Sequence, residues 1–387
     1  SASAESASKY PDMALAQMIH KATVAAALVD AAEAQRVGIV DTLQDTVMTE
    51  ISQELENPSL YRHLQSILPY DGLTDPDLAL MDEKHAKHVK ELEVKVEEAK
   101  ESAGDMEVLD ACLEIARFAA KSLSKEQAIE AYEKVLQLPK LSTGKQIDAL
   151  MEESRVASFY GDTKKNAELI EKASKLAEDG GDWDRRNRLK VYNALSKLLA
   201  RDVKEAASLL IDCVATFSCG ELCPYPEFVV YTIISNILFL PRTELKSKII
   251  DGPDILSVAN KIPVVMKLVN ALYDCDYKAY LHAMVEVQPI LVADRFLQPH
   301  SGYIMRELHV LGYKQFLDSY KSVTLESMAE SFGVSVAYLD LQLSRFIAAG
   351  RLTAKVDKYN GVVETNRPDL KNTQYRDMIQ KGDHLLN

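Results

Sequence analysis

The sequence has few residues that break helices for its length of 387 residues. Glycine occurs 15 times and proline 13 times. Together with abundant Ala, Leu, Glu and Lys, this scarcity predicts a mostly helical chain. Apolar residues make up 47% of the sequence, which is ample for burial, and the length suits two or three domains.

Cysteines and long apolar runs are also scarce. The five cysteines, at positions 112, 213, 219, 223 and 275, are too few for a disulfide framework and fit a reducing compartment. No secretory signal opens the sequence, and SASAESASKY is expected to be a disordered tail. The longest apolar run, residues 228–240, is too short to cross a bilayer. We therefore expect a buried core helix there, no membrane partner, and a soluble intracellular protein.

Patterns that would support catalysis or metal binding are missing. The eight histidines include no His-x-His pair, and Cys213, Cys219 and Cys223 have no fourth zinc ligand nearby. His85 and His88 stand at i and i+3 in a charged helical stretch, where we expect a solvated pair rather than a metal site. The sequence therefore predicts no catalytic residue, no metal, no cofactor and no enzymatic activity.

Three segments of the first half align with one another. They are QAIEAYEKV (127–135), NAELIEKAS (166–174) and EAASLLIDC (205–213). The alignment places Ala128, Ala167 and Ala206 at intervals of 39 residues. Small residues at such points allow two helices of a hairpin to pack closely. The pattern predicts a tetratricopeptide-like solenoid built from helix pairs.

Residues 321–371 show the pattern of a helix-turn-helix followed by a β-hairpin. Thr324 and Ser335 are suited to cap the two helices, Gly333 to form the turn between them, and Gly350 to end the second helix. Two strands are expected near residues 351–357 and 362–365, joined across Asn360-Gly361. The prediction is a winged helix whose two-stranded wing has an exposed edge that a partner strand can join.

The second helix of this module is a poor reader of DNA. Its inner face is expected to consist of Val336, Leu339, Leu343, Phe346 and Ile347. The outer face then carries Leu341 and Arg345 among small residues, where a DNA reader would present several basic or amide groups. Residues 321–370 contain six basic and six acidic groups, and the whole chain has a net charge of −13. These charges favour a protein partner over nucleic acid.

Several segments resemble a known family. They are YRHLQSILPYDGL (61–73), FVVYTIISNILFLPRTELKSKIIDGPDIL (228–256) and FGVSVAYLDLQLSRFIAAGRLTAKVDKYNGVVETNRPDLKNTQY (332–375). They look like the 26S proteasome non-ATPase regulatory subunit 6 family. The order of helical repeats and winged helix also resembles the PCI domain, a module shared by scaffold subunits of the proteasome lid, the signalosome and a translation initiation factor.

The resemblance implies a non-catalytic scaffold subunit of the proteasome lid, which acts in ubiquitin-dependent protein degradation. It implies a hetero-oligomer in the cytoplasm and nucleus, with other lid PCI subunits, the lid deubiquitinase and the ATPase ring as partners. PCI subunits of this family pair through their winged-helix sheets, and the C-terminal helices of lid subunits bundle together. Two alternatives remain, namely a scaffold of the signalosome and a nucleic-acid-binding winged-helix protein.

The patterns and the resemblance together predict a mainly α chain. Its expected parts are an N-terminal tail and helical segment (1–75), a helical-repeat solenoid (76–222), a PCI domain (223–371) and a C-terminal helix (372–387). Within the PCI domain, residues 223–320 are expected to be helical and residues 321–371 to form the winged helix with its small β-wing.

The candidate interface residues lie on the winged helix and on the C-terminal helix. They are Leu341, Arg345, Lys355, Lys358, Tyr359, Val362, Glu364, Tyr375, Met378, Ile379, Leu385 and Leu386. The last five share one face of a helix because they are spaced at three, four, ten and eleven residues from the first of them. A helix this short is marginal alone in water, so its apolar face requires a packing partner.

Overall fold

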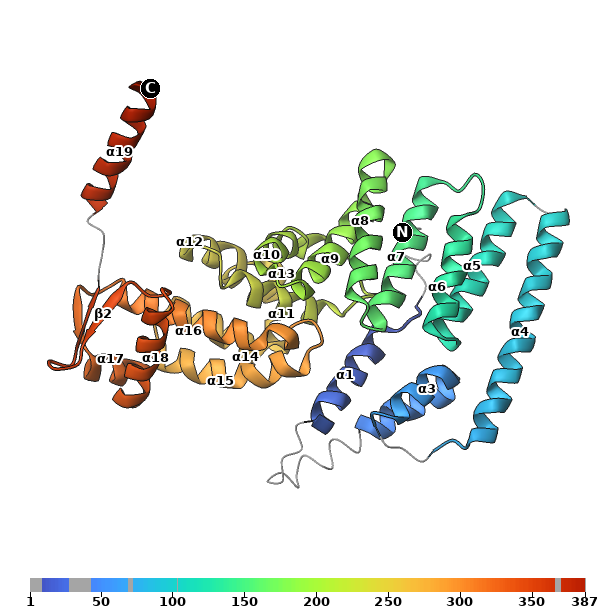
Figure 1. Cartoon of the computed structure of the whole chain (residues 1–387), viewed down its shortest axis with the longest axis horizontal. Coiled ribbons are helices and arrows are strands. Elements are labelled where there is room, and N and C mark those ends of the chain that lie inside the picture. Colours follow the sequence, from blue (N-terminus) through green and yellow to red (C-terminus); the bar gives the residue numbers. More distant parts are fainter. Residues whose placement is uncertain (1–8, 28–42, 69–71, 103, 366–369, 387) are drawn as a thin grey trace. The chain divides into compact units, whose positions relative to one another are not determined.

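The fold is taken from a computed structural model of the chain, which describes residues 9–27, 43–68, 72–102, 104–365 and 370–386. Most of the expected disordered tail, residues 1–8, lies outside the described residues. The chain divides into two compact units (Figure 1). Unit 1 comprises residues 1–239, 253–258 and 290–300, and unit 2 comprises residues 240–252, 259–289 and 301–387.

Unit 1 is helical throughout its described part. Its helices are α1 (Met13–Ala27), the π-helical turn η1 (Glu50–Glu54), α3 (Pro58–Gln65), α4 (Asp75–Ser102), α5 (Asp105–Ser122), α6 (Lys125–Leu136), α7 (Thr143–Phe159), α8 (Thr163–Gly180), α9 (Trp183–Leu199), α10 (Val203–Asp212), η2 (Val214–Thr216), α11 (Tyr225–Asn236), α13 (Pro253–Leu256) and η5 (Gln298–His300). Helices α4 to α11 pack in sequence order, each against the next (Figure 1). The predicted helical-repeat solenoid is confirmed, with α5–α6, α7–α8 and α9–α10 as its helix pairs.

The second helices of these pairs start in the same way. Each begins at an N-cap side chain that accepts a hydrogen bond from a backbone N–H of the first turn: Ser124, Asp162 and Asp202. The fourth residue after each cap is buried: Ala128, Asn166 and Ala206. Ala167 is exposed, so the predicted register of the middle repeat was wrong by one position. A buried amide needs a partner, and Asn166 Oδ1 accepts a hydrogen bond from Ser154 Oγ at 2.6 Å.

The two histidines of α4 face the neighbouring helix. The His85 side chain is buried and its ring packs edge-on against Phe118 of α5, with 5.6 Å between ring centroids. His88 packs against the same ring at 4.7 Å. The expected solvated pair was therefore wrong for His85, because α5 covers this side of α4. Burial lowers the pKa of His85. Among the described residues, no group of three or more His, Cys, Asp or Glu side chains is arranged to hold a metal ion.

The longest apolar run forms a buried helix, as predicted. In α11, Phe228, Val229 and Ile233 are fully buried. Cys219 and Cys223 lie just before this helix, and burial raises the pKa of both thiols. Across the described ranges, none of the helices combines the length and apolar character that a membrane crossing requires.

Unit 2 contains the winged helix. Its elements are α12 (Arg242–Glu244), the π-helical turn η3 (Leu245–Ile250), η4 (Ala259–Lys261), α14 (Pro263–Tyr273), α15 (Tyr277–Ala293, which belongs to this unit as far as Pro289), α16 (Ser301–Leu317), β1 (Ser322–Thr324), α17 (Leu325–Phe332), α18 (Val336–Ala348), β2 (Ala354–Asp357), β3 (Val362–Thr365) and α19 (Leu370–Leu386). Gly312 allows α15 and α16 to approach closely, because a Cβ at this position would lie 2.8 Å from Tyr280 Cε1. The Tyr280 hydroxyl donates a hydrogen bond to the Leu308 carbonyl of α16 at 2.8 Å.

The helix-turn-helix forms at the predicted residues. Thr324 Oγ1 caps α17 by accepting a hydrogen bond from Ser327 N, and Ser335 Oγ caps α18 by accepting one from Tyr338 N. Gly333 forms the turn with a φ of +66°, in the left-handed region that favours glycine. The local signals in the sequence therefore gave the correct helix boundaries.

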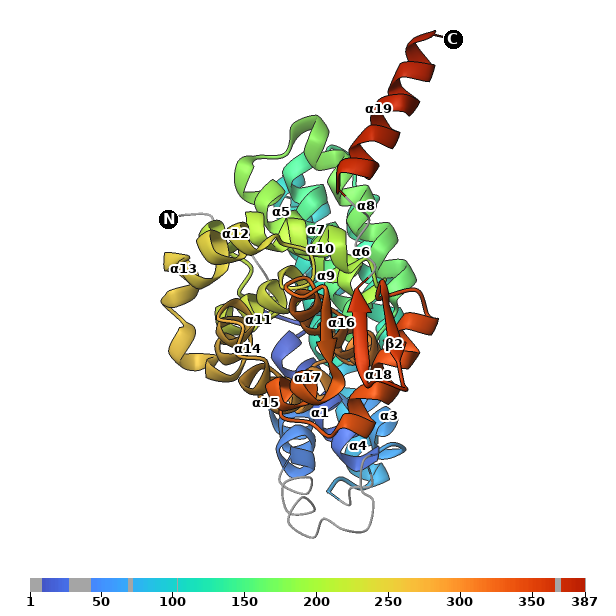
Figure 2. The same ribbon diagram turned by 90° about the vertical axis from the view of Figure 1, so that its left-hand side faces the viewer.

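The wing differs from the prediction because it has a third strand. The three strands form a small antiparallel sheet, of which Figure 2 labels β2. The strand order is β1-β3-β2, with Val323 of β1 and Val356 of β2 on either side of Val363 of β3. Both predicted strands are confirmed, as β2 and β3. The expected number of two strands was wrong, because β1 pairs with the outer side of β3. The free edges of the sheet belong to β1 and β2.

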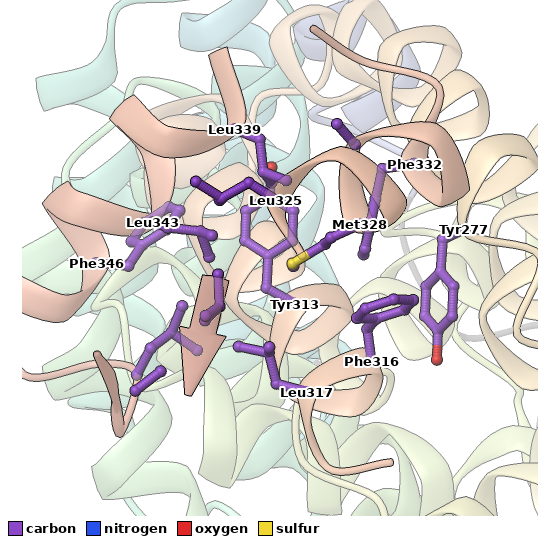
Figure 3. Close-up of a cluster of buried hydrophobic side chains, with 14 of the residues drawn as sticks. Tyr277, Tyr313, Phe316, Leu317, Leu325, Met328, Phe332, Leu339, Leu343 and Phe346 are labelled. Atoms are coloured by element: carbon purple, nitrogen blue, oxygen red, sulfur yellow. The ribbon is translucent and has the colours of Figure 1, made fainter. Parts of the chain in front are cut away.

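The core of the winged helix joins α15, α16, α17, α18 and the sheet (Figure 3). Tyr313 of α16 is fully buried, and its ring centroid lies 5.0 Å from that of Phe332 of α17. Leu339 and Leu343 fill the core from α18, and Val363 closes it from the sheet. This core holds the outer face of α18 and the wing as one rigid module.

Candidate subunit-interaction surface

The outer face of α18 exposes an apolar stripe. Leu341 is 57% exposed and Tyr338, three residues earlier, is 39% exposed. Arg345 continues the same face one turn later and is exposed. Val336 is also exposed, so its predicted place on the inner face was wrong, because it is the first residue of the helix and lies beyond the core. Sequence reasoning missed Tyr338, although its three-residue spacing from Leu341 was a usable signal.

The tip of the wing presents a tyrosine on an ordered turn. Tyr359 is 97% exposed. The Asp357 carboxylate accepts hydrogen bonds from the backbone N–H groups of Tyr359 and Asn360 at 2.9 and 3.2 Å, and from Asn360 Nδ2 at 2.7 Å. These bonds, with the Asn360 side chain first, lower the pKa of Asp357. The turn therefore holds an exposed aromatic ring that makes few contacts of its own.

An ion pair connects the wing to α18. Lys358 Nζ lies 2.9 Å from Asp340 Oδ2, next to Leu341 in the helix. Lys358 remains largely exposed, so the pair contributes little to stability. The ion pair instead holds the wing tip close to α18. Leu341, Arg345, Lys358 and Tyr359 thus belong to one module.

The strand β2 forms one of the two free edges of the sheet. Thr365 N–H donates to the Lys321 carbonyl at 3.0 Å, so this N–H of β3 points toward β1. Because N–H directions alternate along a strand, Glu364 N–H points toward β2 and its opposite residue Lys355 bonds back to β3. The N–H of Val356 must then point away from the sheet. No described strand pairs with that side of β2, whereas Val362 and Glu364 lie on the central strand.

The C-terminal helix α19 spans 17 residues and has an exposed apolar face. Tyr375, Met378 and Ile379 are 63%, 65% and 64% exposed. The side chains of the remaining two predicted residues of this face, Leu385 and Leu386, lie outside the described residues. The predicted helix is confirmed, and three large side chains of its apolar face lack cover.

Known proteins are similar to this chain in sequence. A family model described as 26S proteasome subunit RPN7 matches residues 77–248, and a PCI domain model matches residues 284–367. The 26S proteasome non-ATPase regulatory subunit 6 homolog of Arabidopsis thaliana is 42% identical over 327 residues, which are 84% of this chain and 84% of that protein. The chain belongs to the 26S proteasome non-ATPase regulatory subunit 6 family.

Two further relatives allow the proteasome and signalosome families to be compared. The 26S proteasome regulatory subunit rpn7 of Schizosaccharomyces pombe is 35% identical over 376 residues, which are 89% of this chain and 94% of that protein. The COP9 signalosome complex subunit 1 of Arabidopsis thaliana is 24% identical over 200 residues, 51% of this chain and 45% of that protein. The resemblance seen in the sequence is confirmed, and the match to the proteasome subunit 6 family is the stronger of the two.

The two family models cover different parts of this subunit 6 family chain. The RPN7 match includes the solenoid from α4 to α11, and the PCI match includes α16 and the winged helix. The exposed stripe of α18, the wing tip and the free edge of β2 therefore all lie within the PCI domain. The helix α19 follows it.

Proposed function

We propose that the chain is a non-catalytic scaffold subunit of the lid of the 26S proteasome regulatory particle. In this role it supports ubiquitin-dependent protein degradation by joining lid subunits through its PCI domain. The observation that carries the proposal is a PCI winged helix with a free sheet edge beside an exposed apolar stripe, in a chain of the subunit 6 family. Partners are other PCI subunits and, within the assembled particle, the deubiquitinase and the ATPase ring, in the cytoplasm and nucleus.

Strand addition at β2 gives this surface a physical mode of assembly. The outward N–H of Val356 and the neighbouring carbonyl groups can pair with a strand of the adjacent subunit. The Lys355 side chain stands on the same strand and is exposed. Tyr359 and Leu341 of the same module add exposed apolar area for a partner. Aromatic and aliphatic side chains of this kind supply most of the binding free energy at protein interfaces.

The helix α19 is proposed as a second assembly element. Burying one large apolar side chain contributes about 1.5–3 kcal/mol, and three such side chains are largely exposed on this helix. A bundle with the C-terminal helices of neighbouring subunits would cover them. The alternative is that α19 folds back onto its own winged helix, and truncation after Lys371 separates the two arrangements.

A single substitution tests strand addition without removing a bond of the sheet itself. Val356→Pro deletes the outward N–H of β2, and proline is tolerated on an edge strand when its missing N–H faced solvent. Val356→Ala is the matched control, since it shortens the side chain but keeps the N–H. We expect the tagged wild type and the alanine variant to co-purify with PCI subunits of the lid, and the proline variant to lose the adjacent one.

The same experiment distinguishes the rival functions. Co-purification with proteasome ATPase subunits supports the lid, whereas co-purification with a cullin-directed isopeptidase would support the signalosome. Equal recovery of the adjacent PCI subunit by both Val356 variants would contradict strand addition at β2. Circular dichroism of each variant must show an unchanged helix content for these comparisons to hold.

A further inference from the structure

A groove with a volume of about 500 Å³ lies between α16 and α18. Binding sites in proteins commonly have volumes of about 300–1,000 Å³. The apolar part of its lining is formed by Met305, Val310, Phe346 and Ala349. Val310 and Phe346 are also members of the buried winged-helix core. The groove therefore has a rigid apolar floor that is part of the folded module.

Positive charge surrounds this apolar floor. Three arginines and one glutamate line the groove: Arg306, Arg345, Arg351 and Glu307. The Arg351 guanidinium donates a hydrogen bond to the Glu307 carboxylate, which satisfies that pair. Arg306 and Arg345 are exposed, and neither forms an ion pair or hydrogen bond with any residue that the structure describes. Two guanidinium groups are thus available to a ligand.

The remaining ionisable group of the groove is neutral at neutral pH. His309 Nδ1 lies 2.7 Å from the Met305 carbonyl, so this nitrogen carries the proton and donates it. Burial lowers the pKa of His309. The three arginines and Glu307 therefore leave the groove with an excess of two positive charges. This contrasts with the net charge of −13 of the whole chain.

We propose that this groove binds a short acidic peptide segment of a partner protein. An Asp or Glu carboxylate of the segment pairs with Arg306 and Arg345, and an adjacent apolar side chain of the segment packs against Met305 and Phe346. Arginine matches a carboxylate because its planar fork donates two parallel hydrogen bonds. The apolar floor removes water from this pair and strengthens it.

The distribution of charge favours an acidic peptide over nucleic acid. Nucleic acid presents a continuous row of phosphates and requires a broad basic surface. Here the excess of two charges is confined to the groove, while residues 321–370 are balanced in charge. A peptide with one or two carboxylates matches the excess of two positive charges in the groove. The proposal stands independently of lid membership, because it rests on the groove alone.

The ligand can be identified by selection. Phage-displayed random dodecapeptides are selected on the immobilised full chain and counter-selected on the double variant Arg306→Gln, Arg345→Gln. Both arginines are exposed, so this variant is expected to fold, which circular dichroism and a melting curve verify. Peptides that survive are expected to contain Asp or Glu beside a large apolar residue. The recovered peptide is then labelled with fluorescein for anisotropy measurements.

The matched control removes the same charge elsewhere. Lys204→Gln together with Lys261→Gln neutralises two exposed lysines outside the groove. We expect about tenfold weaker peptide binding for each arginine replaced, as one lost charge-assisted hydrogen bond predicts. The control should bind within about twofold of the wild type. Changing the acidic residue of the peptide to its amide should weaken binding to the wild type to a similar extent.

Four results would overturn the proposal. The first is that no selected peptide depends on Arg306 or Arg345. The second is a set of dependent peptides without acidic residues. The third is that a 20-nucleotide single-stranded DNA competes for the groove more strongly than the selected peptide, with the steep salt dependence of phosphate binding. Loss of binding in the lysine control would likewise show that total charge, and not the groove, is responsible.

Discussion

Replacing Asp294 should loosen the attachment of helix α1 to the rest of unit 1. The Asp294 carboxylate is 7% exposed and accepts four hydrogen bonds. Its Oδ2 accepts from Gln17 Nε2 of α1 at 2.8 Å and from the Tyr231 hydroxyl of α11 at 2.6 Å. Its Oδ1 accepts from the backbone N–H groups of Phe296 and Leu297 at 2.8 and 3.0 Å. One buried carboxylate thus joins three segments that are far apart in the sequence.

Three substitutions remove different numbers of these bonds. Tyr231→Phe removes one, which should cost about 2 kcal/mol, because a hydrogen bond to a charged group is worth about 1.5–3 kcal/mol. Asp294→Asn keeps an oxygen that can accept from the two backbone N–H groups. Its amide nitrogen cannot accept the hydrogen bonds of Gln17 and Tyr231, so we expect a loss of stability of about 3 kcal/mol. Gln17 cannot compensate by rotating its amide, since its Oε1 already accepts from Arg295 N at 3.2 Å.

Asp294→Ala removes all four bonds and leaves buried donors without an acceptor. Its cost should be about 4 kcal/mol, in the range of about 3–5 kcal/mol for removing one partner from a buried charged network. The four bonds do not add, because donors on one carboxylate share its charge. At roughly 2 °C per kcal/mol for a unit of this size, the melting temperature should fall by about 4, 6 and 8 °C for Tyr231→Phe, Asp294→Asn and Asp294→Ala.

The assay is thermal unfolding followed by circular dichroism, combined with hydrogen exchange of residues 13–27. Amides of α1 should exchange faster in both Asp294 variants, which lose the bond to Gln17, and at the wild-type rate in Tyr231→Phe, which keeps it. Asp179→Ala, at an exposed position of α8, is the control and should stay within about 0.5 kcal/mol of the wild type. Equal melting temperatures for Tyr231→Phe and Asp294→Ala, or unchanged protection of α1 in Asp294→Ala, would refute the reasoning.

Three further predictions concern pH, the tail and nucleic acid. Burial raises the pKa of Glu153, which is 1% exposed, so the native state favours its protonated form and stability falls as pH rises from about 4 through the raised value. Glu153→Gln should therefore melt higher than the wild type at pH 7 and at the same temperature at pH 4; a lower melting temperature at pH 7 would contradict this. Truncation after Lys371 should shift the melting temperature by only a few degrees yet prevent entry into a reconstituted lid, whereas a large drop would favour folding back onto the winged helix. Arg345→Ala with Lys358→Ala should leave duplex DNA binding non-specific, weaker than about a micromolar at about 0.15 M salt; a sequence-preferring complex tighter than that would exclude the protein-binding interpretation.

The sequence by itself determined the elements whose signals are local. The caps Thr324 and Ser335 and the turn at Gly333 act within a few residues, so the helix-turn-helix could be predicted to the residue. The run of residues 228–240 predicted a buried helix because ten of its thirteen residues are apolar and it is too short to cross a bilayer. The tail helix and its exposed face followed from spacing alone. Family membership could be inferred because long continuous segments, such as residues 332–375, resemble the family.

Only the tertiary structure decided which faces are covered. The strand β1 has three residues, too few for a pattern, and it exists because β3 offers an unpaired side. Because β1 pairs with β3, Val362 and Glu364 lie on the central strand. A free edge is formed instead by Val356 and its neighbours on β2. The burial of His85 depends on Phe118 of another helix, and Asn166 replaces Ala167 at the packing position because Ser154 satisfies its amide.

The groove between α16 and α18 is another feature that only the tertiary structure decided. Arg306 and Arg345 are 39 residues apart in the sequence and show no local signal. They come to one site because the core of Tyr313, Phe332 and Leu343 fixes the two helices against each other. The spacing of apolar residues predicts which face of one helix or strand is buried, because this spacing follows from the local backbone geometry. Which faces meet depends on long-range packing, which no single segment encodes.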